Sequence, residues 1–266
     1  MELAMNDNNL EKIIKESYEI QINNITKNFD STDGNVYLIK SNNNKYIFKI
    51  YNSLEHTQSM IKLHNFLNEN NLYVPRIIQT ENKEYYKRYN DKYIVMYSFL
   101  EGMQLKNIIQ TVDNKTILKL AKEIRRLHDL TENVTFNLKH IDFNLETESK
   151  RKSVLHFDLT KDNIFINKDK VGFIDFDDAK FGPSVYDVAI TISLLFLSKS
   201  RGAELDKIKT FIDSYYESDT QNKERELPYI KSIALKWIDY LLTKNSFDTS
   251  TKESFEVKKK LIEEYL

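Results

Sequence analysis

The residues best suited to chemistry lie in one short stretch in the second half of the chain. It contains His156, Asp158 and Asn163, and Asp175 follows after two apolar runs that flank a polar turn at 167–170. This pattern predicts a β-hairpin, and paired antiparallel strands bring their outer ends together. We therefore expect Asn163 and Asp175 to be spatial neighbours, with Asp158 in the loop just before them.

Oxygen-bearing side chains held side by side suit Mg²⁺, a hard cation that takes one or two carboxylate or carbonyl ligands and fills its shell with water and phosphate oxygens. A further carboxylate close by can accept a proton or orient a hydroxyl. Together these groups are the working parts of phosphoryl transfer, in which charge neutralisation and positioning of the nucleophile provide most of the catalysis. The plainer interpretation is that they are turn and cap residues, because Asp and Asn are common in turns.

The elements that would position these residues change in character along the chain. Alternating and β-rich runs separated by polar turns dominate the first hundred residues, whereas helical periodicity dominates afterwards. Residues 98–102 mark the change. We expect helices at about 10–18, 53–70 and 117–128, strands at 36–39, 45–51, 85–89 and 93–97, the hairpin at 164–174, and helices through the C-terminus.

Two motifs in the hairpin region carry a family resemblance. The segments 156–163 (HFDLTKDN) and 174–179 (IDFDDA) resemble those of kinase-like phosphotransferases, specifically the aminoglycoside phosphotransferase and choline kinase group. The resemblance implies that Asp158 is the catalytic base and that Asn163 and Asp175 hold Mg²⁺. It also implies an α+β, two-lobed protein-kinase-like fold.

The resemblance continues beyond the hairpin and divides the chain. Residues 182–189 are similar to the family's stretch after the metal-binding Asp, which implies that Asp187 braces the active-site loop. His156 is expected to be a hydrogen-bonded structural imidazole rather than a proton carrier. The implied lobes are a small antiparallel β-rich N-lobe at 1–97, a hinge at 98–102 and a larger, mainly helical C-lobe at 103–266.

Two features of the first half resemble the family's phosphate-binding elements. Asp33-Gly34-Asn35, between two strands, looks like a phosphate-covering hairpin turn, in which Gly34 and Asn35 can adopt positive φ. Lys49 stands on the next strand, where the family has its phosphate-binding lysine. Each feature also has a plain interpretation. The triplet could be an ordinary hairpin turn, and Lys49 could be a solvated lysine at the edge of the sheet.

A nucleotide base site is also implied by the resemblance. The segment 97–100 resembles the hinge, where backbone groups of Ser98 and Leu100 would bond the purine edge. The apolar walls would be formed by Ile47, Phe165 and Ile174. Individually these three are as well explained by core packing, and only their joint placement favours a nucleotide slot.

One departure from the family concerns the partner of Lys49. The family pairs this lysine with a Glu on the following helix, but here the aligned positions hold Ser59 and Met60. Glu55 or Gln58 could take its place if the helix is shifted by one turn. The identity of the partner stays open.

The resemblance implies an ATP-dependent kinase that moves the γ-phosphate to a hydroxyl of a small molecule. The acceptor class stays open between an aminoglycoside-type antibiotic and a metabolite such as choline or homoserine, and so does the choice between ATP and GTP. A catalytically weak or inactive nucleotide-binding module of the same fold is the alternative. A protein kinase is disfavoured, since the chain lacks a G-x-G-x-x-G loop and an A-P-E segment. Carboxylates that could line a site for a polycation are Asp177, Asp178, Asp213, Glu217 and Asp219.

Composition narrows the class of protein. The 266 residues include 39 basic and 40 acidic side chains and no cysteine, which disfavours a nucleic-acid partner and excludes thiol chemistry. The N-terminal residues lack the pattern of a signal peptide, and the most apolar run, at 188–197, is too short to span a bilayer. We expect a cytoplasmic protein with no membrane partner. The oligomeric state stays open. The remaining histidines are not spaced as metal ligands, and we assign no chemistry to His56, His64, His128 and His140.

Overall fold

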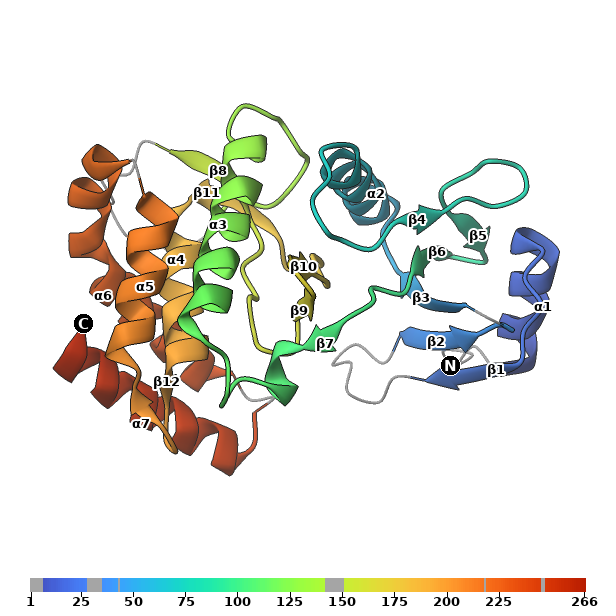
Figure 1. Ribbon diagram of the computed structural model, residues 1–266. Helices are drawn as coiled ribbons and strands as arrows, with labels where there is room; N and C mark the ends of the chain where they lie inside the picture. Colours follow the sequence, from blue (N-terminus) through green and yellow to red (C-terminus); the bar gives the residue numbers. More distant parts are fainter. Residues whose placement is uncertain (1–6, 28–34, 43, 142–150, 218, 245–246) are drawn as a thin grey trace. The chain divides into compact units, whose positions relative to one another are not determined.

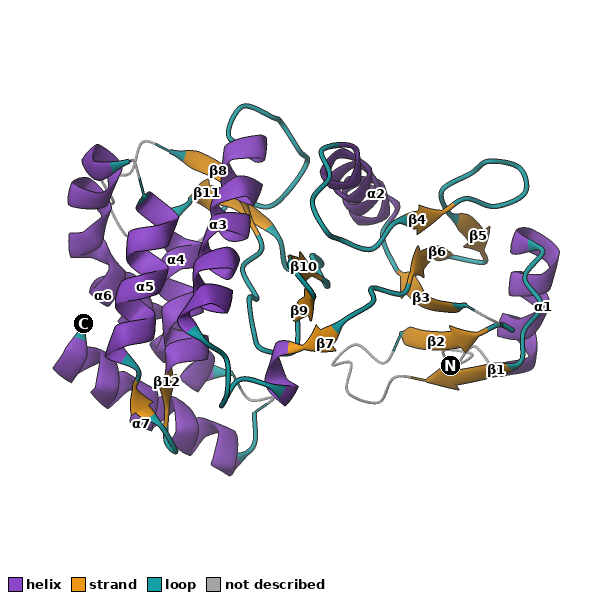
Figure 2. Ribbon diagram, in the orientation of Figure 1, coloured by secondary structure: helices purple, strands orange, loops and turns teal. Residues whose placement is uncertain are grey.

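A computed structural model describes the chain except for residues 1–6, 28–34, 43, 142–150, 218 and 245–246. The chain divides into two units, Met1–Glu101 and Gly102–Leu266, at a point within the predicted 98–102 segment (Figure 1). The first unit is rich in antiparallel strands and the second is mainly helical (Figure 2). The predicted α+β, two-lobed fold is therefore confirmed.

The first unit is built on one antiparallel sheet. Its strands lie in the order β1-β2-β3-β6-β4, and β5 also pairs with β6. The predicted helices and strands are present with small shifts at their ends, whereas β4 was not predicted because a two-residue strand has no measurable periodicity. The elements are α1 (Asp7–Tyr18), β1 (Asn24–Lys27), β2 (Val36–Lys40), β3 (Lys45–Tyr51), α2 (Leu54–Glu69), β4 (Ile77–Ile78), β5 (Lys87–Tyr89) and β6 (Lys92–Ser98).

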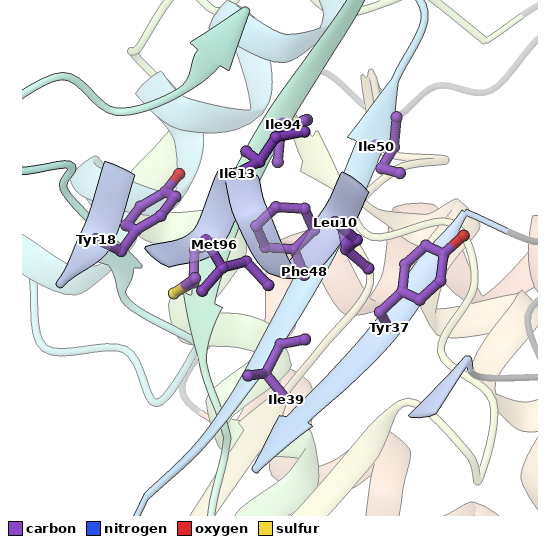
Figure 3. Packing of buried hydrophobic residues seen from close by; sticks show 10 residues of the cluster. Leu10, Ile13, Tyr18, Tyr37, Ile39, Phe48, Ile50, Ile94 and Met96 are labelled. Atoms are coloured by element: carbon purple, nitrogen blue, oxygen red, sulfur yellow. The ribbon is translucent and has the colours of Figure 1, made fainter. Parts of the chain in front are cut away.

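Alternating side chains of these strands pack against a different helix on each face. On one face, Leu10 and Ile13 of α1 pack with Phe48 of β3 and Met96 of β6 (Figure 3). On the other face, Val95 and its neighbours Tyr51 and Tyr97 pack with Ile61 of α2. The period of two in a strand thus separates the residues of β3 into an α1-facing set and an α2-facing set.

The second unit combines short antiparallel sheets with helices. The sheets are β10-β9-β7, β11-β8 and β12-β13. A single π-helical turn, η2, follows α4 directly. The elements are β7 (Met103–Gln104), the 3₁₀ turn η1 (Leu105–Asn107), α3 (Asn114–Thr131), β8 (Lys152–Leu155), β9 (Ile164–Asn167), β10 (Lys170–Phe173), β11 (Lys180–Pro183), α4 (Val185–Thr191), η2 (Ile192–Phe196), β12 (Leu197–Ser198), β13 (Gly202–Ala203), α5 (Leu205–Tyr216), α6 (Thr220–Thr243) and α7 (Thr249–Tyr265).

Helix α3 shows how the sequence sets these elements. Asp113 caps its N-terminus, where the side chain accepts a hydrogen bond of 2.8 Å from the backbone N–H of Thr116. Of the predicted apolar stripe, Leu120, Ile124 and Leu127 are buried, whereas Leu118, which was predicted with them, is exposed. Within the described ranges, no helix is both long enough and apolar enough to cross a membrane.

Lys258 of α7 is buried and joins this helix to the π-helical turn. Its Nζ donates to the backbone carbonyls of Ser193 at 2.7 Å, Leu194 at 3.1 Å and Leu197 at 2.5 Å.

Lys258→Met would leave these carbonyls without that donor, so we expect the free energy of unfolding to fall by about 2 to 4 kcal/mol in urea titrations. Lys259→Met, which removes a surface ion pair with Asp239, should stay close to wild type. Equal stability of the two variants would contradict the expectation.

Candidate active site

The hairpin β9–β10 brings the two predicted metal-binding segments together. Ile164 pairs with Phe173, and the backbone N–H of Ile174 donates to the carbonyl of Asn163 at 3.0 Å. Asn163 therefore lies opposite the residue that precedes Asp175. Sequence spacing was sufficient to predict this register because both segments are continuous with the strands of one hairpin.

The amide of Asn163 joins the metal-binding segment to the predicted catalytic base. Its Nδ2 donates to the Asp158 carboxylate oxygen Oδ2 at 2.7 Å and to the Asp158 backbone carbonyl at 2.9 Å. Asn163 is buried, and Asp158 is only partly exposed. Because both N–H bonds of the amide are directed at Asp158, the oxygen Oδ1 of Asn163 is the atom suited to a metal ion.

His156 connects the loop to the end of the hairpin. Its Nε2 lies 2.8 Å from the carbonyl of Ile174, and the backbone N–H of Asp158 points at its Nδ1 at 3.4 Å. A carbonyl can only accept, so the proton is on Nε2 and Nδ1 is the acceptor. The ring is fully buried beside Phe176, with centroids 4.5 Å apart. This is the geometry of a hydrogen-bonded structural imidazole.

Asp187 of α4 holds the backbone of the same loop. Its Oδ2 accepts from the backbone N–H of His156 at 2.7 Å, and its Oδ1 accepts from that of Phe157 at 2.9 Å. The carboxylate is completely buried. Phe157 has a φ of 67°, in the left-handed region that a residue with a bulky side chain rarely adopts. The two hydrogen bonds to Asp187 hold the loop in this conformation directly before Asp158.

Negative charge accumulates around Asp158. Burial raises the pKa of its carboxyl group, and the charges of Asp175 and Asp178 raise it further, whereas the hydrogen bond from Asn163 lowers it. Asp175 itself has a left-handed φ of 66°, which turns the chain at the end of the hairpin. Carboxylates crowded in this way favour a cation among them.

The donor set fits Mg²⁺. Asn163 and Asp175 offer an amide oxygen and a carboxylate, which are hard oxygen ligands, and Mg²⁺ usually takes few protein ligands. Within the described part of the chain, no group of three or more His, Asp or Glu side chains is arranged to hold a metal ion. The chemistry of the available oxygens, with the negative charge around them, is what supports the metal prediction.

The predicted nucleotide-binding residues of the first unit lie on strand β3 and in the segment before β2. Ile47 and Lys49 are partly buried and lie on the α2-facing side of β3, two positions apart. The carbonyl of Asn35 accepts from Ile50 at 3.0 Å, and Gly34 lies outside the described residues. The nucleotide role of these residues stays a prediction.

At the predicted hinge, the backbone of Ser98 is already used in part. Its N–H donates to the carbonyl of Arg76 at 2.7 Å, and its Oγ accepts from the Arg76 N–H at 2.9 Å. The carbonyl of Ser98 is therefore the group to consider for a purine edge. Leu100 is buried, as is Phe165 of the second unit, whereas Ile174 is partly exposed.

Helix α2 does not present an acidic side chain at the aligned positions. Ser59 and Met60 are buried, and the Ser59 hydroxyl donates to the carbonyl of Glu55 at 2.9 Å. The side chains of Glu55 and Gln58 are exposed. The partner of Lys49 therefore stays open.

Three of the carboxylates considered for a polycation site each bond a basic side chain. The ion pairs are Asp213–Lys223 at 2.7 Å, Glu217–Lys122 at 2.8 Å and Asp219–Arg125 at 2.9 Å. Because a paired carboxylate has less net charge to offer a ligand, these groups give little support to a polycationic acceptor. Asp177 and Asp178 lie instead in the loop after Asp175.

Contacts that the sequence analysis did not predict hold the part of the loop directly before Asn163. The backbone N–H of Lys106 donates to the carbonyl of Lys161 at 2.9 Å, the Lys106 Nζ lies 2.8 Å from Asp162, and Gln104 Nε2 donates to the Asp162 carbonyl at 3.0 Å. These partners come from β7 and η1, which are too short to be read from a periodic pattern. His128, to which no role was assigned, contacts Asp187.

The stretch that carries this geometry also matches a family model. Residues 136–215, which include Asp158, Asn163, Asp175 and Asp187, match the phosphotransferase enzyme family. The resemblance to kinase-like phosphotransferases is confirmed. The prediction of an enzyme of the small-molecule kinase class is confirmed with it. No curated protein matches the chain significantly.

Solved phosphotransferase structures share the fold over nearly the whole chain. An amicoumacin kinase in complex with AMP-PNP, Ca²⁺ and Ami superposes with a TM-score of 0.74 at 12% identity, covering 98% of this chain and 94% of that one. A microcompartment-associated aminopropanol kinase gives 0.68 at 13% identity, with 96% and 95% covered. A spectinomycin phosphotransferase in complex with ADP and spectinomycin gives 0.64 at 16% identity, with 96% of both chains covered. At these identities the likeness shows the fold alone.

Proposed function

We propose that this phosphotransferase moves the γ-phosphate of ATP to a hydroxyl group of a small molecule. The observation that carries the proposal is the hydrogen bond from the Asn163 amide to the Asp158 carboxylate. Across the hairpin, Asn163 also bonds the backbone of Ile174, the residue directly before Asp175. In this proposal the base and the two oxygen ligands belong to one hairpin and the loop before it. Positioning and charge neutralisation are what phosphoryl transfer requires.

In this proposal each side chain has a separate task. Asp158 accepts or orients the proton of the acceptor hydroxyl, and the Asn163 amide fixes the carboxylate in one orientation. Asn163 Oδ1 and the Asp175 carboxylate would hold Mg²⁺, which when bound neutralises charge on the phosphate oxygens. His156 and Asp187 keep the loop in place through their hydrogen bonds to backbone groups.

The nucleotide-binding assignments are part of the same proposal. Lys49 would bind phosphate oxygens, the turn at Gly34 and Asn35 would cover them, and the remaining residues would contact the base, namely Ile47, Ser98, Leu100, Phe165 and Ile174. Support comes from similar structures solved with AMP-PNP and ADP. Competition between ATP and GTP in a binding assay would decide the preferred nucleotide.

The acceptor class remains the finer question. The structurally similar enzymes include two named for antibiotics and one named for aminopropanol, so both acceptor classes belong in the assay. The test is ATP consumption with Mg²⁺ across aminoglycosides, macrolides, choline, homoserine and small amino alcohols. Phosphate transfer to one of these compounds supports the proposal, and turnover of none of them, with ATP still bound, favours the alternative.

That alternative is a nucleotide-binding module without turnover. It is favoured by the absence of an acidic residue at Ser59 and Met60 of α2, where the family has its Glu. The intact bridge between Asn163 and Asp158 is the observation against it. Calorimetric binding of ATP without any transfer would identify such a module.

Asp175→Ala tests the metal site. We expect affinity for ATP in the presence of Mg²⁺ to fall by about 10- to 100-fold, because the variant loses a charged oxygen ligand. Isothermal titration with and without Mg²⁺ measures the change. Asp169→Ala is the matched control, since Asp169 lies at the turn of the same hairpin and pairs with Lys119. An unchanged Mg²⁺ dependence in Asp175→Ala would remove this residue from the metal site.

A further inference from the structure

A buried histidine outside the loop bonds the same carboxylate that holds the loop. His128 Nε2, on α3, lies 3.1 Å from Asp187 Oδ2, the oxygen that also accepts from the backbone N–H of His156. His128 and Asp187 are both completely inaccessible to solvent. A buried carboxylate that accepts from three donors is fixed in position and in rotation.

The histidine is itself oriented by a third buried group. The hydroxyl of Tyr215, on α5, lies 2.6 Å from His128 Nδ1. A carboxylate can only accept, so the His128 proton is on Nε2, and Nδ1 accepts from the tyrosine hydroxyl. Burial lowers the pKa of His128, which agrees with a neutral ring in this arrangement. Tyr215, His128 and Asp187 thus form a directed chain of hydrogen bonds from α5 through α3 to α4.

The end of this chain lies beside the reacting group. Asp187 bonds the N–H groups of His156 and Phe157, and Asp158 is the next residue. Phe157 keeps its left-handed φ only while the loop is held, because that conformation is unfavourable for a bulky residue. Rotation of the Asp187 carboxylate would release one of the two N–H groups and shift Asp158. A shift of about 1 Å at a reacting group can lower a rate about 100-fold.

We infer that His128 and Tyr215 are positioning residues for phosphoryl transfer, which act through the Asp187 carboxylate on the backbone before Asp158. The inference rests on the proposed function. A purely structural role predicts a different result, namely a general loss of stability with no selective effect on this loop or on kcat. The two possibilities are separated by kinetics and by hydrogen exchange at named amides.

Three variants grade the interaction. His128→Leu removes the donor to Asp187, His128→Gln keeps an N–H donor, and Tyr215→Phe removes only the hydroxyl that orients the ring. Tyr216→Phe is the matched control, because the hydroxyl of this neighbouring, equally buried tyrosine bonds Glu226 at 2.7 Å instead. Circular dichroism and thermal melting verify that each variant is folded at the assay temperature.

The kinetic readout uses Mg²⁺-ATP and the panel compound that the wild type phosphorylates fastest. We expect His128→Leu to lower kcat by about 10- to 100-fold with the KM for ATP changed by less than about threefold. His128→Gln should recover about tenfold of that loss, and Tyr215→Phe should lower kcat by about threefold to tenfold. Tyr216→Phe should leave kcat unchanged. Equal effects of Tyr215→Phe and Tyr216→Phe on kcat would overturn the inference. This comparison remains the test in the case that His128→Leu does not fold.

Hydrogen exchange provides a readout that does not depend on turnover. The amides of His156 and Phe157 should exchange about 10- to 100-fold faster in His128→Leu, while amides of α3 and α5 keep their protection. Unchanged exchange at these two amides, or a uniform increase over the whole unit, would overturn the inference. If the wild type phosphorylates no compound, the proposed function fails, and the exchange comparison still decides whether His128 fixes the loop.

Discussion

Asp158→Asn is expected to lower phosphate transfer by about 10²- to 10⁴-fold while ATP still binds. The amide has the shape of the carboxylate, and its oxygen can still accept the bond of 2.7 Å that Asn163 Nδ2 donates to Oδ2, so the loop should keep its conformation. What the variant loses is the charge and basicity that receive the acceptor proton. Steady-state kinetics with the fastest panel acceptor and calorimetry with ATP measure the two effects.

The control for Asp158→Asn is the same change at Asp169. That carboxylate is exposed at the hairpin turn and pairs with Lys119, so transfer should remain at the wild-type level. Undiminished transfer in Asp158→Asn would reject this residue as the base. Loss of transfer together with loss of ATP binding would instead indicate a disrupted site.

Asp187→Ala is expected to lower the free energy of unfolding by about 3 to 5 kcal/mol and to abolish transfer. The change leaves three buried donors without their acceptor, namely the N–H groups of His156 and Phe157 and the Nε2–H of His128. Each unsatisfied buried donor costs about 1 to 3 kcal/mol, and partial relaxation of the loop explains a total below the sum. Urea denaturation followed by circular dichroism provides the measurement.

Two companion variants sharpen the result for Asp187. Asp187→Asn keeps one acceptor oxygen but turns an NH₂ group toward a donor, so its stability should lie between those of wild type and Asp187→Ala. Asp239→Ala removes an exposed carboxylate that pairs with Lys259 and should leave stability nearly unchanged. If Asp187→Ala were as stable as Asp239→Ala, the buried carboxylate would not hold the loop.

The part of the site that could be read from the sequence is the part made by neighbouring residues. Asn163 and Asp175 flank one hairpin, and its turn and alternating strands set the register that brings Ile174 to Asn163. The bond from Asn163 to Asp158 spans only five positions. Helix α3 was likewise predictable, because its apolar stripe and its Asp113 cap are local features.

Other features depended on partners that no local pattern indicates. The side chains of Asp213, Glu217 and Asp219 looked suitable for a cationic ligand, but each bonds a lysine or arginine that folding brings to it. The strands β4 and β7 have two residues each and exist only because a longer strand pairs with them. His128 was given no role, because its spacing to the other histidines suits no metal site.

By itself, the sequence determined the change from strands to helices near residues 98–102, the hairpin and the groups that could do chemistry, because periodicity, turn residues and motif spacing are properties of contiguous chain. The two-lobed fold class came from the family resemblance of the motifs. The tertiary structure alone decided what holds those groups still. Tyr215 meets His128 across 87 positions, and His128 meets Asp187 across 59. Such contacts form only when helices pack, since a buried polar group takes whichever partner the packed core places within hydrogen-bond distance.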